Sequence, residues 1–438
     1  MFRTLINAFK NKEIRTKILI TLALLFLYRI GCWLPVPGID KEVFNATQSN
    51  GLLGLLSAVT GSALANGAIL ALGISPYINA SIIVQLLGAA IPALERYSKQ
   101  GEEGRKKLNK ITRYVTLALA LIQAIGITVM WNSVGGLNDS MYENTIFDNK
   151  WVIGASIVIM LVAGSMFSTW MGERITEIGV GNGISLLIFI GILSTADLAL
   201  VATVKTMANG GSEATLAAWS LLGFVVMAIL IFGLIVFVDL AERRIPVQYA
   251  KQIKGRKQYG GQTTNIPIKV NASGVMPIIF ASAIITFPQM LGQIFWPNSG
   301  LHAWWNNYMG AGKWPYAVAM ALLILAFSYF YATLQFKPDE VARNLQQYGG
   351  FIPGTRPGKP TYELLNKVSK RITLFGAIYL AFIALVPSLL FSIFTFENQT
   401  LVTSMTATGM LIIVSVGLEL DKQLQSLMMM KQYKGFLK

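Results

Sequence analysis

The chain has 438 residues, of which 54% are hydrophobic and only 13% are charged. Soluble domains carry roughly 25% charged residues, so this composition excludes a soluble enzyme of this length. One cysteine and one histidine exclude an internal disulfide, a cysteine zinc cluster and a paired-histidine metal site. The sequence also lacks a glycine-rich phosphate loop ending in lysine. We therefore expect a membrane protein with neither a cofactor nor enzymatic activity.

Apolar runs long enough to cross a hydrocarbon layer of ~30 Å recur along the whole chain. The ten predicted spans are 18–35, 68–94, 114–131, 151–171, 183–203, 216–238, 274–295, 315–334, 372–394 and 401–418. Lys and Arg number 5 in the N-terminal tail, 7, 1, 7 and 7 in alternate connections, and 4 in the C-terminal tail. Positive charge collects on the cytoplasmic side, so both termini are predicted to be cytosolic.

Residues 43–94 form a stretch of 52 residues without a charge, which is far longer than one span requires. Two spans there would place the basic loop 96–113 outside, against the positive-inside rule. We therefore predict that residues 51–66 enter the membrane region without crossing it, beside protein or a water-filled cavity. The alternative is an amphipathic helix that lies in the outer headgroups.

Amphipathic and folded segments are predicted on the cytosolic side as well. Residues 1–17 indicate an interfacial amphipathic helix. Residues 241–273 alternate apolar and polar side chains, which indicates a two-stranded ribbon. Its basic tip contains Lys254, Arg256 and Lys257. Residues 335–371 indicate a helix, a turn and a second helix that opens at Thr361, with Arg356 in the turn between two Pro-Gly corners.

Two explanations of the cytosolic charge remain open. Positive-inside topology alone accounts for most of the basic residues. Two rigid basic tips, however, suit an anionic partner at the cytosolic face, either ribosomal RNA or an acidic protein surface.

Five stretches of the chain together resemble the SecY family, the channel subunits of bacterial protein translocases. They are Arg29-Ile-Gly with Pro35-Val-Pro-Gly-Ile, Ala71-Leu-Gly-Ile-Ser-Pro-Tyr-Ile-Asn-Ala-Ser-Ile, Gly172-Glu-Arg-Ile-Thr-Glu-Ile-Gly-Val-Gly-Asn-Gly-Ile-Ser, Asn271-Ala-Ser-Gly-Val-Met-Pro and Phe351-Ile-Pro-Gly-Thr-Arg-Pro-Gly. Their number and order extend the resemblance over nearly the whole chain.

The resemblance implies an all-α polytopic membrane protein of ten transmembrane helices. Two pseudo-symmetric five-helix halves are expected at 18–203 and 204–420, followed by a cytosolic tail at 421–438. The implied function is a channel of the bacterial cytoplasmic membrane that passes unfolded secretory polypeptides across and releases membrane-protein helices sideways. The expected partners are SecE-like and SecG-like small subunits, the SecA motor, the ribosome, signal peptides, secretory polypeptides and anionic lipids.

The resemblance also assigns functional residues. An apolar ring at the narrowest point is expected from Ile74, Ile78, Ile184, Ile188, Ile279 and Ile412, although Ser75 and Asn79 add polarity beside it. Spacing alone would leave these isoleucines facing lipid. A plug falls on 51–66, with Leu52, Leu53, Leu55, Leu56 and Val59. A lateral gate is expected to carry Gln85, Gln123 and Asn271, for which ordinary interhelical hydrogen bonding is the alternative. Docking of the motor or ribosome is expected at Lys254, Arg256, Lys257 and Arg356.

A secondary transporter is the rival interpretation, because inverted repeats also give five plus five spans. The only charged residues within the predicted spans are Arg29 and Asp197, both toward outer ends, so a solute site is hard to assemble. We expect Arg29 to reach the outer headgroups. A membrane enzyme would need histidine, cysteine or paired carboxylates at midplane depth, and the spans lack such a cluster.

Overall fold

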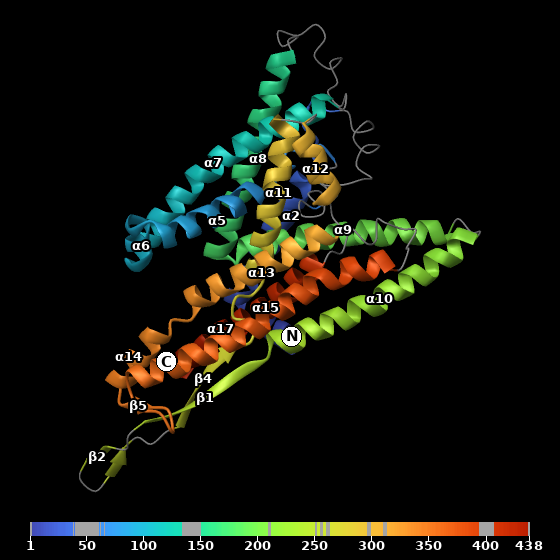
Figure 1. Ribbon diagram of the computed structural model, residues 1–438. Coiled ribbons are helices and arrows are strands. Elements are labelled where there is room, and N and C mark those ends of the chain that lie inside the picture. The colour runs from blue at the N-terminus through green and yellow to red at the C-terminus, as the bar shows by residue number, and fades with distance from the viewer. Residues whose placement is uncertain are drawn as a thin grey trace.

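The protein is mostly helical, with long helices in an elongated body and strands at one end (Figure 1). The computed structural model describes residues 2–37, 39, 61, 63–64, 66–133, 150–208, 212–249, 252–254, 257–259, 263–295, 299–309, 313–393 and 407–436.

The bounds of the elements follow the chain order of Figure 1. The helices are α1 (Phe2–Lys10), α2 (Lys12–Gly31), α5 (Ser75–Ala90), α6 (Pro92–Lys99), α7 (Gly101–Ser133), α8 (Lys150–Ile178), α9 (Gly183–Ala208), α10 (Ser212–Asp239), α11 (Met276–Phe295), α12 (Gly300–Tyr308), α13 (Trp314–Gln335), α14 (Pro338–Gln347), α15 (Lys359–Ile393) and α17 (Ala407–Phe436). The strands are β1 (Glu242–Tyr249), β2 (Gln252–Lys254), β3 (Lys257–Tyr259), β4 (Thr263–Lys269) and β5 (Gly350–Phe351).

Each predicted apolar run overlaps one of the long helices. By length and composition, five helices in the described part of the chain are able to cross a membrane: Gly101–Val129, Trp151–Ile178, Leu221–Asp239, Trp314–Gln347 and Lys359–Leu385. Helix α10 is the most apolar of these, and large side chains such as Leu230 and Phe237 lie exposed on it. A helix that is hydrophobic all round and incompletely covered by protein suits a lipid environment.

The second apolar run differs from the single span predicted over 68–94. Residues 68–74 form turns, with a bridge between Pro35 and Ala68, and α5 covers only Ser75–Ala90. Proline disfavours helical geometry in the residue before it, and Ile91 before Pro92 is extended. The chain therefore breaks there and continues as α6.

Helices from the first and second halves of the chain meet along one side of the helical body. Helices α5 and α7 pack against each other, α11 and α13 do the same, and α11 also contacts both α5 and α7. Apolar side chains fill the interior of the α11 and α13 layer, where Ile278 and Ile324 are fully buried beside Ile235 of α10. This side of the protein therefore joins the early helices to the late ones.

The predicted ribbon forms and acquires an additional strand. Strands β1 and β4 pair antiparallel from Glu242 with Lys269 to Gln248 with Thr263. Strand β5 from the later connection pairs with the other edge of β1, which gives the order β4-β1-β5. Strands β2 and β3 form a separate small hairpin. The sequence did not predict that the two connections contact each other, and the sheet joins them.

The long terminal helices extend beyond the apolar runs. Helix α15 begins at Lys359 and continues into the ninth apolar run, so the second helix of the predicted helix–turn–helix opens two residues before Thr361. Helix α17 continues to Phe436, through most of the segment predicted as a tail. The amphipathic helix predicted over residues 1–17 is shorter, because α1 ends at Lys10 and α2 begins at Lys12 after the N-cap Asn11. Helix α1 packs on α17 through Ala8 and Leu424.

Candidate functional site

Isoleucines from four helices meet at one place in the interior. Ile188 and Ile192 of α9 and Ile412 of α17 are buried together. Half-buried Ile78 of α5, Ile184 of α9 and Ile279 of α11 pack against them. We call this group the isoleucine cluster. It brings together five of the six residues predicted for the apolar ring.

The sixth predicted residue, Ile74, lies next to the cluster and not in it. It is buried in a neighbouring apolar group that also contacts Ile78 and Ile184. The cluster in turn contains Ile192, and Val416 packs against it; neither residue was predicted. Both could have been found from spacing, since each lies four residues after a predicted ring member and thus on the same helix face.

A tight turn before α9 sets the position of Ile184 and Ile188. The Asn182 side chain accepts a hydrogen bond from the backbone N–H of Ile184 at 3.1 Å, as a helix N-cap does. The Gly183 N–H donates to the Thr176 hydroxyl at 2.9 Å. A β-carbon at Gly183 would stand 2.0 Å from the carbonyl oxygen of Gly172. Only glycine therefore allows α9 to start this close to α8.

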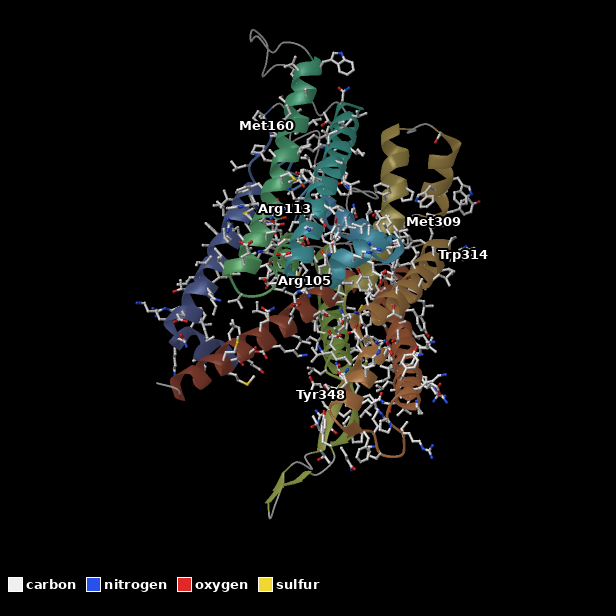
Figure 2. The ribbon with its side chains drawn as sticks, turned by 90° about the vertical axis from the view of Figure 1, so that its left-hand side faces the viewer. Arg105, Arg113, Met160, Met309, Trp314 and Tyr348 are labelled. Carbon is white, nitrogen blue, oxygen red and sulfur yellow. The ribbon has the colours of Figure 1, made fainter. Side chains whose placement is uncertain are left out.

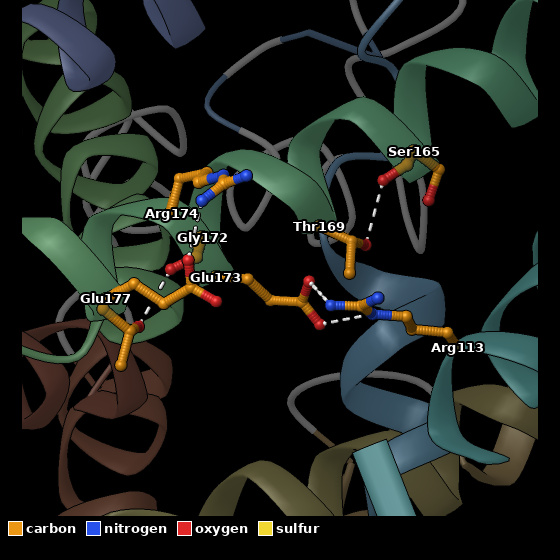
Figure 3. Close-up of polar contacts among 8 residues, drawn as sticks. Arg113, Ser165, Thr169, Gly172, Glu173, Arg174 and Glu177 are labelled. Carbon is orange, nitrogen blue, oxygen red and sulfur yellow. Dashed lines mark hydrogen bonds and ion pairs between the residues drawn. The ribbon is translucent and has the colours of Figure 1, made fainter. Parts of the chain in front are cut away.

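An ion pair joins α7 to α8 beside this turn (Figure 3). The Arg113 guanidinium contacts both carboxylate oxygens of Glu173, with Nε at 2.9 Å and Nη2 at 2.5 Å. Bidentate pairs of this kind fix orientation as well as distance. One turn further along α8, Arg174 pairs with Glu177. The neighbouring helices are thus joined by a geometrically specific contact.

One predicted gate residue bonds across the side where early and late helices meet. The Tyr331 hydroxyl of α13 donates to Gln85 Oε1 of α5 at 2.6 Å. The Gln85 amide donates in turn to the Ser81 hydroxyl at 3.1 Å. The Phe280 ring of α11 lies beside this contact, tilted against the Tyr331 ring at a centroid distance of 4.9 Å. A polar bond with an aromatic neighbour therefore joins α5 to the later helices.

The other two predicted gate residues lie elsewhere. Gln123 is buried on α7, which packs against both α5 and α11. Asn271 precedes α11 and donates from Nδ2 to Asp239 Oδ1 at 2.7 Å. Asp239 is the last residue of α10, so this hydrogen bond links the end of α10 to the segment before α11.

The structure corrects the expectation for Arg29. Its guanidinium points into the protein, where it donates to the carbonyl oxygen of Gly61 at 3.1 Å and to the hydroxyl of Ser194. Two acceptors within reach compensate for removing the charge from water, so the side chain does not extend to the headgroups. The predicted plug residues Leu52, Leu53, Leu55, Leu56 and Val59 lie outside the described residues.

The predicted Arg356 turn lies on a small folded unit. Ile352 and Leu365 are buried with Ile245, Val247 and Ile268 of the sheet. Gly354 (φ 83°) and Gly358 (φ 101°) form the two corners on either side of Arg356. The Thr361 hydroxyl, which is itself buried, donates to the Arg356 carbonyl oxygen at 2.8 Å. The backbone of Arg356 is therefore held while its side chain is exposed.

The other predicted basic tip belongs to the small hairpin. Lys254 of β2 pairs with Lys257 of β3 at the end of that hairpin, and Arg256 lies outside the described residues. Figure 2 shows Tyr348 beside the sheet, far from Met160 on α8, so both tips lie at one end of the protein.

Chemically, this arrangement offers an apolar cluster in the interior and an exposed guanidinium at the Arg356 turn. Across the residues that the structure describes, no three His, Cys, Asp or Glu side chains gather as metal ligands would. β-Branched side chains such as isoleucine are stiff at χ1, and an apolar constriction resists wetting. Such a site can seal a path or let an extended chain slide, because it offers few hydrogen bonds to hold the chain.

Comparisons with known proteins agree on one family. A family model described as SecY matches residues 68–420. A protein translocase subunit SecY of Streptomyces galbus is 41% identical over 448 residues, covering 100% of both chains. The subunit of the same name from Halalkalibacterium halodurans is 37% identical over 445 residues, again covering 100% of both.

Solved structures share the fold. One described as the structure of a protein conducting channel has a TM-score of 0.64 at 19% identity, covering 94% of this chain and 91% of that chain. Sec61 in the canine ribosome-channel complex from the endoplasmic reticulum has a TM-score of 0.61 at 17% identity, with the same coverage.

The contact between Gln85 and Tyr331 predicts a specific cross-link. With Cys32 replaced by alanine, a chain carrying Gln85→Cys and Tyr331→Cys should be joined by a bifunctional thiol reagent, because these side chains touch. Joining is measured on a denaturing gel after cutting a protease site inserted between β2 and β3. The control pairs Gln85→Cys with Tyr329→Cys, an exposed residue two positions away on α13. Equal joining of both pairs would contradict the contact.

Proposed function

The chain belongs to the SecY family, and we propose that it is the channel-forming subunit of a protein translocase. It conducts unfolded secretory polypeptides across the membrane and releases membrane-protein helices sideways into lipid. The observation that carries this function is full-length similarity to translocase subunits, on a fold in which isoleucines of α5, α9, α11 and α17 meet. The secondary transporter that the sequence left open is not supported by these relatives.

The proposed topology has ten spans and two cytosolic termini in a bacterial cytoplasmic membrane. Its support is the alternation of basic residues between the ten apolar runs. The two five-helix halves are then 18–203 and 204–420, and the sheet with the Arg356 turn lies in the cytosol. Residues 51–66 complete the first half as a segment that does not cross.

Labelling of single cysteines tests this topology. In a chain with Cys32→Ala, the exposed Lys106→Cys on α7 should react only with a reagent supplied from the cytosolic side. Trp151→Cys, which is 86% exposed at the start of α8, should react only from the outside. Labelling of Lys106→Cys from outside would overturn the ten-span arrangement.

We assign the seal of the resting channel to the isoleucine ring together with the plug. Ile78, Ile184 and Ile279 retain some exposed surface while the rest of the cluster is buried, as expected of side chains that line a narrow path. An apolar collar passes few ions when dry. The plug at 51–66 adds a second barrier, so neither alone should seal completely.

Conductance of the reconstituted protein tests the seal. Ile78→Ser and Ile188→Ser should each raise resting ion conductance, because a hydroxyl favours wetting of the constriction. Deleting residues 51–66 as well should lengthen the openings. Ile188→Leu should leave conductance near that of the parent, since the collar requires volume and dryness. Ile229→Ser on the exposed face of α10 is the matched control. If both serine variants without the plug conduct no more than the parent, the sealing proposal is wrong.

The lateral gate is proposed at the side where α5 and α7 face α11 and α13. Gln85 with Tyr331 is a single hydrogen bond across this boundary, and such bonds in membranes contribute about 0.6 kcal/mol on average. A bond of this size holds the helices in register without preventing separation. Gln123 and Asn271 are proposed to belong to the same gate region through their places on α7 and before α11.

Partner docking is proposed on the sheet end of the protein. Arg356 is assigned to the SecA motor, and Lys254, Arg256 and Lys257 are assigned more to the ribosome. Sec61 is described in a complex with the ribosome, which supports ribosome docking as a proposal for this chain. SecE-like and SecG-like subunits, signal peptides and anionic lipids complete the proposed partners.

The assignment of Arg356 predicts the effect of a substitution that keeps the positive charge. Arg356→Lys should weaken motor-driven translocation, because a guanidinium on a rigid turn makes bidentate contacts that an ammonium cannot. Arg343→Lys on α14 is the control, since that exposed arginine already pairs with Asp339 within its own helix. Translocation into vesicles with SecA and ATP is the measurement. Unchanged translocation by Arg356→Lys would refute the assignment.

A further inference from the structure

Asp239, which the sequence analysis did not assign, joins three segments of the chain. It is the last residue of α10. Its Oδ1 accepts a hydrogen bond from Asn271 Nδ2 at 2.7 Å, and its Oδ2 accepts one from the Ser415 hydroxyl at 2.8 Å. Asn271 lies in the segment that leads into α11, and Ser415 lies on α17. One carboxylate therefore fixes α11 and α17 relative to α10.

These segments also carry members of the isoleucine cluster. Ile279 lies in the first turn of α11, eight residues after Asn271, and Ile412 lies three residues before Ser415 on α17. Val275, between Asn271 and Ile279, packs against the cluster as well. The Asp239 contacts therefore lie within eight residues along the chain of Ile279 and within three of Ile412.

The energetics indicate that the hydrogen bonds of Asp239 position these segments more than they stabilise the fold. A carboxylate at a helix C-terminus faces the negative end of the helix dipole, and both partners here are neutral. Asn271 is 7% exposed, and its buried Oδ1 has no hydrogen-bond partner in the described part of the chain. Apolar packing at such a place is often as stable as buried polar groups, so stability alone does not account for the arrangement.

The segment before α11 has little other freedom. A β-carbon added to Gly376 of α15 would lie only 2.5 Å from the carbonyl oxygen of Val270, so the two segments are in close contact. Val270 N–H donates to the carbonyl oxygen of Ala241 at 3.0 Å, just beyond α10. Asn271 is thus held by α10 on one side and α15 on the other, so the Asp239 bonds act on a segment that is already positioned.

We propose that Asp239 is a positioning residue that latches α11 to α17 and so favours the closed isoleucine cluster. This inference rests on the proposed channel function. Separation of Ile279 from Ile412 requires the carboxylate to lose at least one of its two donors. The exchange of that donor for water sets part of the free-energy difference between the closed and open channel.

Resting conductance of variants measures the latch. Ser415→Ala and Asp239→Asn should each raise the open probability of the reconstituted channel by about tenfold, as expected for loss of a hydrogen bond to a charged group. The double variant should exceed Asp239→Asn by much less than tenfold, because both changes break the same contact. Asp421→Asn on α17 is the matched control, since Asp421 accepts a bond from Gln425 of its own helix.

Further readouts separate the latch from a purely structural role. Ser415→Ala should keep the apparent melting temperature of the parent and its translocation of substrates with intact signal peptides. Parent-like conductance of both single variants, additive effects in the double variant, or an equal rise for Asp421→Asn would each overturn the latch. A parent protein that translocates no polypeptide with its partners would instead overturn the proposed function.

Discussion

Packing of β-branched side chains where α5, α9, α11 and α17 meet is the interaction on which the rest of the structure depends. These helices come from distant parts of the chain, and the isoleucine cluster is where they share one interior. The tight turn at Gly183 places α9, and Asp239 accepts hydrogen bonds from Ser415 on α17 and from Asn271 before α11. The surrounding helices present apolar faces outward, and polar contacts in the interior add geometric specificity to this packing.

The polar contacts of the interior join elements that are far apart in sequence. Arg113 with Glu173 joins α7 to α8, and Tyr331 with Gln85 joins α13 to α5. Arg29 reaches Gly61 and Ser194 from α2. Hydrogen bonds between helices in a membrane are modest in energy, so they specify an arrangement without making it permanent. This balance suits a channel whose helices must separate and close again.

The sheet end of the protein is built differently, around a small apolar core of its own. Strand β5 joins the edge of β1, and Leu365 of α15 is buried beneath the sheet. The same helix α15 continues into the apolar body. The Arg356 turn, which lies three residues before α15, is therefore connected to the apolar body by one continuous helix.

The sequence by itself determined the apolar runs, the ribbon, the Arg356 turn and the family, because hydrophobic period, Pro-Gly corners and motif order are local properties. The ring isoleucines came from the resemblance, since spacing identifies a helix face and not the partner it meets. Only the tertiary structure decided the pairing of β5 with β1, the inward course of Arg29 and the hydrogen bonds of Asp239. Each of these depends on acceptors or donors brought close from distant segments, and a linear pattern contains no such distance.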